Sequence, residues 1–314
     1  MISVTHKTKQ FLVLIVKLLI VGGAFYFIYN HLANNDQLNW TKFCAILKEK
    51  QSFYNIFVML LLTFSNRFLE IVKWQNLVKV IKKISLGEAS KQVLGALTLG
   101  LFTPYNLGEY AGKALFFEKD KTKKVIFLNL ICNGIQMVVT TFFGVLGLLY
   151  FNAHFKALPT YSVVLLLGIS VLLFGILFVS KKITIKGYSI EKLIHKINKI
   201  PSRIHQKNTW LGIGRYLVFS HQYYFLFLIF DVQMPYLLLM ATITSIYFLA
   251  SILPTFQFLD FAVKGSVAVF FFGLVGVNEW IVVFITTLMW FLNTVLPVLI
   301  GSYFVLNHKM QWKS

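Results

Sequence analysis

Two long stretches of the sequence, residues 161–180 and 281–306, contain no charged residue. An α-helix crosses a bilayer core about 30 Å thick with about 20 apolar residues, and both stretches reach that length. Across the 314 residues, 57% are hydrophobic and only 13% are charged, against about 25% charged in soluble domains. Because a soluble protein could not cover so much apolar surface, and because strand-like alternation is absent, the sequence predicts an all-α integral membrane protein.

Full membrane spans are predicted at 11–29, 53–72, 124–150, 161–180, 210–230 and 280–306. If the N-terminus is cytoplasmic, the inner loops carry 21 Lys and Arg residues, the outer loops carry four, and five lie in membrane-embedded stretches. Such an excess in the inner loops indicates orientation. The net charge of +19 therefore reflects membrane topology, and we expect no nucleic acid partner. We expect a multi-pass protein of a bacterial cytoplasmic (inner) membrane with both termini in the cytoplasm.

Two further apolar regions, 89–118 and 236–277, are interrupted near the middle, at 103–108 and at 254–260. Basic loops flank the first region on both sides, so both of its ends belong in the cytoplasm. Each half offers only about 10–15 helical residues, or roughly 15–22 Å, which is too short to cross. We predict a re-entrant hairpin there, with two interfacial helices as the alternative. The second region forms either a similar hairpin or two full passes, which would raise the number of spans to eight.

The order of these elements repeats along the chain: span, span, broken hairpin, span. The hairpins also share a local motif of acid, aromatic, Ala, any residue and Lys, at 109–113 and 260–264. Because the first half has an odd number of crossings, the second half begins on the opposite side. The sequence thus predicts one membrane domain built as an inverted-topology repeat, 1–157 and 158–314. In transporters, broken helices at corresponding positions of such repeats point to the binding site.

Ionisable groups lie beside both breaks, in apolar surroundings where a charge costs about 2.5–3.5 kcal/mol. In each motif the acid precedes the Lys by four residues, which favours an ion pair within the helix. The pairs either hold the broken helices or serve the substrate. The first break also leaves backbone N–H groups at a helix start, which attract anions. The candidate substrate-binding residues are Pro104, Asn106, Gly108, Glu109, Lys113, Pro254, Asp260 and Lys264.

Arg67, Glu70 and Arg215 lie about one turn inside the predicted ends of their spans. Snorkelling to the membrane interface explains them without a function, and we favour that reading over a secondary site. The inner loop 181–209 carries eight Lys and Arg residues, with apolar residues at helical spacing, which predicts a basic amphipathic helix on the membrane surface. We find no metal-ligand spacing and no cofactor motif, so no cofactor and no metal are expected.

The first break reads Thr103-Pro104-Tyr105-Asn106-Leu107-Gly108-Glu109 and is followed by Lys113. In these residues the sequence resembles the lysylphosphatidylglycerol synthetase transmembrane domain family, and the resemblance extends over essentially the whole chain. Later matches are Leu253-Pro254, Gly276-Val277, Leu296-Pro297 and Gly301. The resemblance implies a flippase-like membrane domain. We expect no lipid aminoacylation, because no segment could house the soluble domain of the bifunctional family member.

The leading hypothesis is a translocase for a lipid or a lipid-linked intermediate, with an anionic headgroup bound between the two broken helices. Lys113 and Lys264 would contact phosphate, while Glu109 and Asp260 would hold the lysines or a headgroup amine. The alternative is a membrane scaffold that anchors a soluble glycosyltransferase or synthetase as its partner. An intramembrane transferase is a further alternative, although no specific nucleophile or acid–base pair stands out, so no catalytic residue is assigned. The expected partners are membrane lipids.

Overall fold

A computed structural model describes residues 52–159 apart from 102, 104 and 105, and residues 195–307 apart from 254–256. It also describes residues 161–162, 164, 168, 184–185 and 188–189, and the single residues 26, 45, 48 and 49. The predicted span 11–29 and most of 161–180 lie outside the described residues, as do Pro104 and Pro254.

The described part of the chain is helical apart from one short pair of strands. The first half contains α3 (Phe53–Val78), α4 (Leu86–Gly100), α5 (Leu107–Ala114), the short η1 (Lys119–Lys121) and α6 (Thr122–Phe155). The second half contains α9 (Ser202–Ile229), α10 (Tyr236–Ile252), η3 (Gln257–Leu259), α11 (Asp260–Leu274), α12 (Glu279–Trp290), the π-helical η4 (Phe291–Val295) and α13 (Leu296–Leu306). Strand β1 (Thr184–Ile185) pairs antiparallel with β2 (Tyr188–Ser189). The predicted all-α class is confirmed.

Local chemistry explains where the first hairpin begins and breaks. The Ser85 hydroxyl accepts from the Glu88 N–H, and the Glu88 carboxylate accepts from the Ser85 N–H, a capping box that starts α4. The hydrogen bond from the Ser85 N–H favours the charged carboxylate and holds the pKa of Glu88 below its ordinary value. Before α5, Asn106 has a φ of 55°, in the left-handed region that ends a helical path. Close packing then follows: a Cβ added at Gly112 would lie 2.9 Å from the Ala96 Cα.

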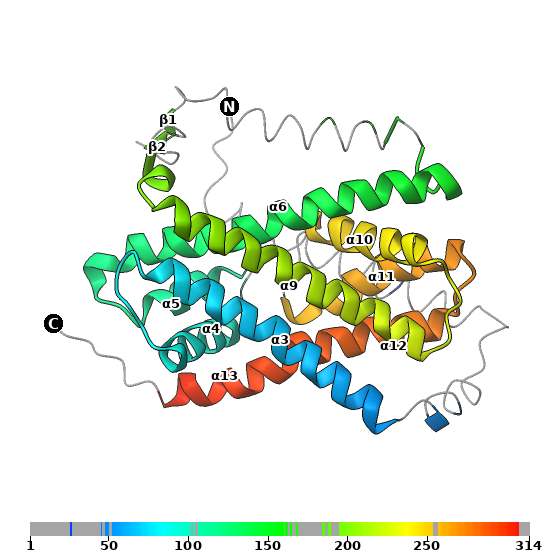
Figure 1. The fold of residues 1–314 in the computed structure, drawn as a ribbon, viewed down its shortest axis with the longest axis horizontal. Helices are drawn as coiled ribbons and strands as arrows, with labels where there is room; N and C mark the ends of the chain where they lie inside the picture. The colour runs from blue at the N-terminus through cyan, green and yellow to red at the C-terminus, as the bar shows by residue number, and fades with distance from the viewer. Residues whose placement is uncertain are drawn as a thin grey trace.

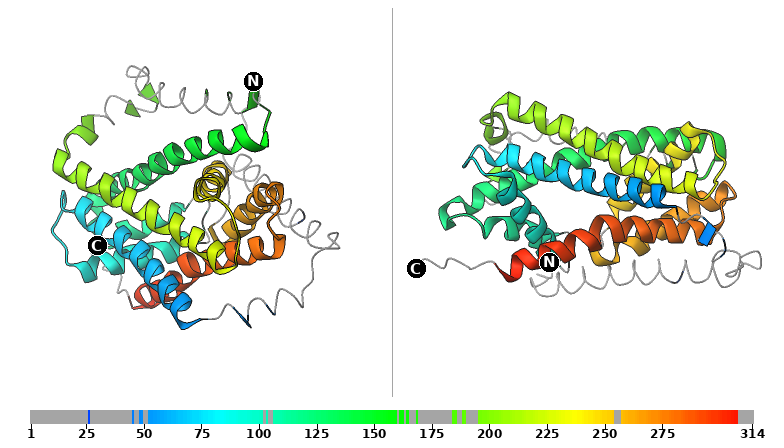
Figure 2. Two further views of the ribbon diagram at one scale, coloured as in Figure 1. Left: turned by 45° about the vertical axis from the view of Figure 1, so that its right-hand side comes forward. Right: turned by 60° about the horizontal axis from the view of Figure 1, so that its bottom comes forward.

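The two broken hairpins lie at opposite ends of a helical bundle, with α4–α5 at one end and α10–α11 at the other (Figures 1 and 2). The longer helices α3, α6 and α9 run along the bundle, and so does the continuous segment α12–η4–α13. The two hairpins therefore occupy opposite ends of the bundle, while the inverted repeat itself stays a prediction. The orientation of each half in a membrane stays a prediction.

The two halves of the chain also pack against each other reciprocally. The last long helix of each half packs against the first hairpin helix of the other, so that α6 contacts α10 and α13 contacts α4. A glycine on α6 and a glycine on α13 allow both pairs of helices to approach closely. A Cβ added at Gly147 would lie 2.8 Å from the Ala241 carbonyl oxygen, and one at Gly301 would lie 2.2 Å from the Leu94 carbonyl oxygen. Each hairpin is thus held by a helix from the other half.

Helix lengths separate spans from hairpins. Among the described residues, three segments are long and apolar enough to cross a membrane: Phe53–Val78, Lys119–Phe155 and Glu279–Leu306. The four hairpin helices have 15, 8, 17 and 15 residues, so none exceeds about 26 Å at 1.5 Å per residue. The first broken region therefore fits the re-entrant reading, whereas α10 lies at the lower limit for a span, so whether the second region re-enters or crosses stays a prediction. The total number of spans stays a prediction.

Apolar side chains divide between two buried clusters and the outer helix faces. One cluster gathers around Phe227 and Phe272 in the second half, and the other around Trp74 and Leu128 in the first. Large apolar side chains also remain exposed along the outside of α3, α6 and α13, including Phe53, Phe57, Phe64, Phe142, Leu299 and Tyr303. An outer surface of this kind suits contact with lipid, because helices that are apolar all round belong in a core or a membrane.

Candidate functional site

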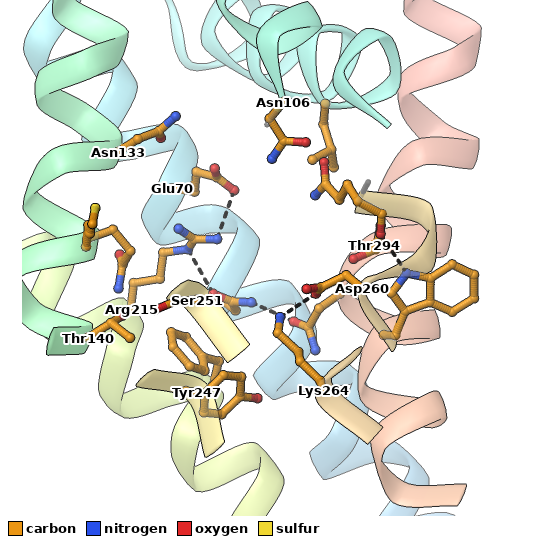
Figure 3. A pocket seen from close by; sticks show the side chains of 18 of the residues that line it. Glu70, Asn106, Asn133, Thr140, Arg215, Tyr247, Ser251, Asp260, Lys264 and Thr294 are labelled. Carbon is orange, nitrogen blue, oxygen red and sulfur yellow. Dashed lines mark hydrogen bonds and ion pairs between the residues drawn. The ribbon is translucent and has the colours of Figure 1, made fainter. Parts of the chain in front are cut away.

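A pocket with a volume of about 590 Å³ lies where the two breaks meet. Asn106 and Glu109, at the start of α5, line it from one side, and Gln257, Asp260 and Lys264 line it from η3 and α11. Figure 3 shows Asn106 on one hairpin and Asp260 with Lys264 on the other, around the same space. The residues next to the two breaks therefore share one pocket, although the two prolines themselves lie outside the described residues.

Three charged residues from α3 and α9 line the same pocket. Arg67 and Arg215 both pair with the Glu70 carboxylate, and the Arg215 Nη2 lies 3.4 Å from the Glu70 Oε2. The exposed fractions of the Arg67, Glu70 and Arg215 side chains are 11%, 9% and 18%. Glu70 is buried and the two arginines are only slightly exposed, which contradicts the expectation that they snorkel to an interface. Because α3 continues to Val78 and α9 already begins at Ser202, both arginines lie about three turns or more from a helix end.

Arg67 also donates a hydrogen bond to the main-chain carbonyl of Asn293. In a regular α-helix that carbonyl would accept from residue 297, but Pro297 has no N–H to offer. Asn293 also lies in the π-helical turn η4, a geometry often found at functional sites. Side chains extend the contact: Asn66 donates to the Asn293 Oδ1 at 2.6 Å and accepts from the Arg215 Nε at 3.0 Å.

The Glu109–Lys113 pair places only its acid in the pocket. Lys113 is completely buried and is not one of the lining residues. Its Nζ lies 2.8 Å from the Glu109 Oε1 and 2.7 Å from the Asn129 Oδ1, and 4.7 Å from the centre of the Trp74 ring. The expected contact between Lys113 and a headgroup phosphate therefore does not fit this structure, because Glu109 stands between Lys113 and the pocket.

The equivalent pair in the second half is more open. The Lys264 Nζ lies 2.5 Å from the Asp260 Oδ2, and their side chains are 32% and 22% exposed. Lys264 also lies over the Tyr247 ring, 5.5 Å from its centre. Figure 3 shows Lys264 and Arg215 extending into the same space from different helices. Lys264 can therefore meet a ligand that Lys113 cannot.

Polar residues inside apolar helices complete the pocket, and they are not among the site residues predicted from the sequence. They include Asn66, Asn133, Gln136, Tyr247 and Asn293. Their signal in the sequence was a polar side chain inside an apolar span, where such groups usually face protein or a cavity. Lys73 was assigned to an inner loop because the predicted span ended at residue 72. It is 1% exposed, and its Nζ donates to the Gln136 Oε1 at 3.3 Å.

The remaining candidate residue, Gly108, serves packing. A Cβ added there would lie 2.1 Å from the Leu99 carbonyl oxygen, and its N–H donates to the Thr103 hydroxyl at 2.8 Å. Within the part of the chain that the structure describes, no group of three His, Cys, Asp or Glu side chains could hold a metal ion. The pocket can thus offer charge and hydrogen bonds, with aromatic rings beside them.

Comparison with known proteins assigns this arrangement to a family. The family model described as lysylphosphatidylglycerol synthase TM region matches residues 14–301, a range that contains both hairpins and the whole pocket. The chain belongs to this family. Membership in the lysylphosphatidylglycerol synthase transmembrane family confirms the resemblance seen at the first break, as well as the multi-pass membrane class, and it connects the chain with membrane lipids. No curated protein sequence matches the chain.

Proposed function

We propose that this protein is a translocase for a lipid or a lipid-linked intermediate, and that the pocket between the two hairpins binds an anionic headgroup. The supporting observation is the convergence of both breaks with two arginines on one pocket of about 590 Å³. A pocket of that volume is in the range of small-ligand sites, about 300–1,000 Å³. It accommodates a headgroup, while the acyl chains stay in the bilayer.

The residue roles differ from those expected from the sequence. Arg67 and Arg215 share one carboxylate, Glu70, so their combined charge exceeds that of their partner. Arginine presents a planar fork of donors that matches phosphate geometry. We therefore assign the phosphate to Arg67 and Arg215, with Lys264 as a third contact.

The reciprocal packing of each half against the hairpin of the other supports movement of that headgroup across the membrane. Each hairpin is held by a helix of the other half, α13 on α4 and α6 on α10. In transporters built from inverted repeats, one half rocks against the other around a fixed central site. A headgroup held by α3 and α9, beside both hairpins, would be exposed to each side in turn.

Flux in proteoliposomes that contain only this protein tests the proposal. We expect headgroup-labelled anionic lipid to change leaflets faster than in protein-free vesicles, and Arg215→Gln to reduce that rate by about tenfold or more, the scale of losing one partner of a buried charged contact. Arg203→Gln is the matched control, because Arg203 lies on the same helix and is exposed.

Two results would count against a translocase. One is flux that equals the protein-free rate at all lipid compositions tested. The other is activity that appears only when a soluble glycosyltransferase or synthetase is added and bound, which would favour the scaffold alternative. Melting temperatures of both arginine variants, measured in the same detergent, show whether each has folded.

A further inference from the structure

The pocket and the side chains directly behind it contain more cations than acids. The cations are Arg67, Arg215 and Lys264, which line the pocket, and Lys73 and Lys113, which are buried behind it. The acids are Glu70, Glu109 and Asp260. Five cations against three acids leave two positive charges without a carboxylate.

The ion pairs show where these two charges are. Lys113 is paired with Glu109 and Lys264 with Asp260. Glu70 is shared by Arg67 and Arg215, so one guanidinium charge remains. The other is Lys73, which has no carboxylate within 4 Å among the residues that the structure describes. Both excess charges therefore lie on α3 and the helices packed against it.

Lys73 reaches the pocket through Gln136. An ammonium group can only donate, so the Gln136 Oε1, which lies 3.3 Å from the Lys73 Nζ, is fixed as the acceptor. The Nε2 of the same amide is therefore a donor; it is buried without a hydrogen-bond partner, and Gln136 lines the pocket. The Arg67 Nε is a second buried donor without a partner. Two lining residues next to the uncompensated charges thus carry a buried donor without a partner, while Asn106 Oδ1 and Gln257 Oε1 are buried acceptors without one.

We infer that the headgroup bound in this pocket carries two negative charges, as in a phosphate monoester or a diphosphate, and not the single charge of a phosphodiester. This inference rests on the proposed function, which supplies the anionic lipid. Buried charge is costly unless it is paired and hydrogen-bonded, and a dianion would neutralise both excess cations. A phosphate monoester has a second pKa of about 6 and carries about two charges at pH 7. Lys73 acts through Gln136 and is a positioning residue.

Equilibrium binding of short-chain lipids with identical acyl chains tests the charge. The probes are dioctanoyl phosphatidic acid, the corresponding diacylglycerol diphosphate and dioctanoyl phosphatidylglycerol, each titrated against the detergent-solubilised full-length protein. We expect the two multiply charged lipids to bind about tenfold or more tightly than the phosphodiester, a difference of one decade in Kd. Equal or tighter binding of the phosphodiester would overturn the inference. The relative Kd of the first two lipids distinguishes the monoester from the diphosphate.

Two substitutions test the part played by Lys73 and Gln136. Lys73→Met keeps most of the unbranched side chain and removes its charge, so the preference for the monoester over the phosphodiester should fall by about fivefold or more. Gln136→Glu gives Lys73 a carboxylate partner and cancels one excess charge, so it should lower the same preference without lowering the melting temperature. Lys79→Met is the control, because Lys79 is exposed at the end of α3. An unchanged ratio of Kd values in Gln136→Glu would refute the inference even if Lys73→Met fails to fold.

Binding and flux measurements together distinguish a failure of this inference from a failure of the proposed function. If the multiply charged lipids bind best but nothing moves between leaflets, the translocase is wrong and the charge assignment stands. If flux is found but favours the phosphodiester, the translocase stands and the charge assignment is wrong.

Discussion

Lys113 and Glu109 form a buried ion pair in which the acid lines the pocket and the lysine does not. The Lys113 ammonium is enclosed by the Glu109 carboxylate, the Asn129 amide oxygen and the Trp74 ring. Lys113 therefore contributes no charge to the pocket surface, and the cations that line the pocket lie on α3, α9 and α11.

The first prediction follows from this burial. Glu109→Gln and Lys113→Gln should each destabilise the protein by about 3–5 kcal/mol, because each leaves one charge without its partner. The double substitution should melt near the wild type and retain most of the lipid flux, since Lys113 does not reach the pocket. Thermal melts and proteoliposome flux of the three variants provide the check. A double variant as inactive as Lys113→Gln would instead show that Lys113 contacts the headgroup.

The second prediction concerns the hydrogen bond that Arg67 donates to the main-chain carbonyl of Asn293. Pro297→Ala supplies an N–H that can bond to this carbonyl within the helix, so Arg67 loses an acceptor and part of its orientation. We expect the melting temperature to stay the same or rise, while headgroup affinity falls several-fold, measured by titration with the probe lipids. Pro201→Ala, at the exposed start of α9, is the control. Unchanged affinity in Pro297→Ala would mean that the contact does not orient Arg67.

The third prediction addresses the packing between the halves. In Gly301→Ala the new Cβ would lie 2.2 Å from the Leu94 carbonyl oxygen, so α13 and α4 must separate, at a cost of about 1–3 kcal/mol. Gly273→Ala is the opposite case, because nothing lies within 4 Å of a Cβ there and alanine favours the helix by about 0.5–1 kcal/mol. Thermal melts should therefore move in opposite directions. A stable Gly301→Ala protein would contradict the close contact.

The fourth prediction tests orientation. Ser202 should face the cytoplasm and Ala157 the outside, because of the imbalance of 21 to four Lys and Arg residues between the loops. Single cysteines at these positions, in a background without Cys44 and Cys132, can be labelled on intact spheroplasts with an impermeant maleimide. We expect labelling at 157 and none at 202 until the cells are opened. The reverse pattern would overturn the predicted orientation, and labelling that places both positions on the same side would overturn the inverted repeat.

The prediction from sequence reached the class and the position of both breaks. Charge-free runs long enough to cross a bilayer, and short helices interrupted by Pro and Gly, are properties of contiguous residues. Family membership could be seen at the first break for the same reason, because the Pro-to-Glu motif at 104–109 is local. The neighbouring residues of both breaks do meet in one pocket.

The choice of charged residues that face this pocket depended on the tertiary structure. The motifs at 109–113 and 260–264 are alike in sequence, yet the Lys113 side chain is fully buried and the Lys264 side chain is 32% exposed. Arg67 was placed near a helix end because the prediction ended its span at residue 72, six residues before α3 ends. Local sequence determined the hydrophobicity and the breaks. Helix ends and packing between distant segments decided the depth and partner of each charge, because a buried charge is neutralised by whatever the fold places beside it.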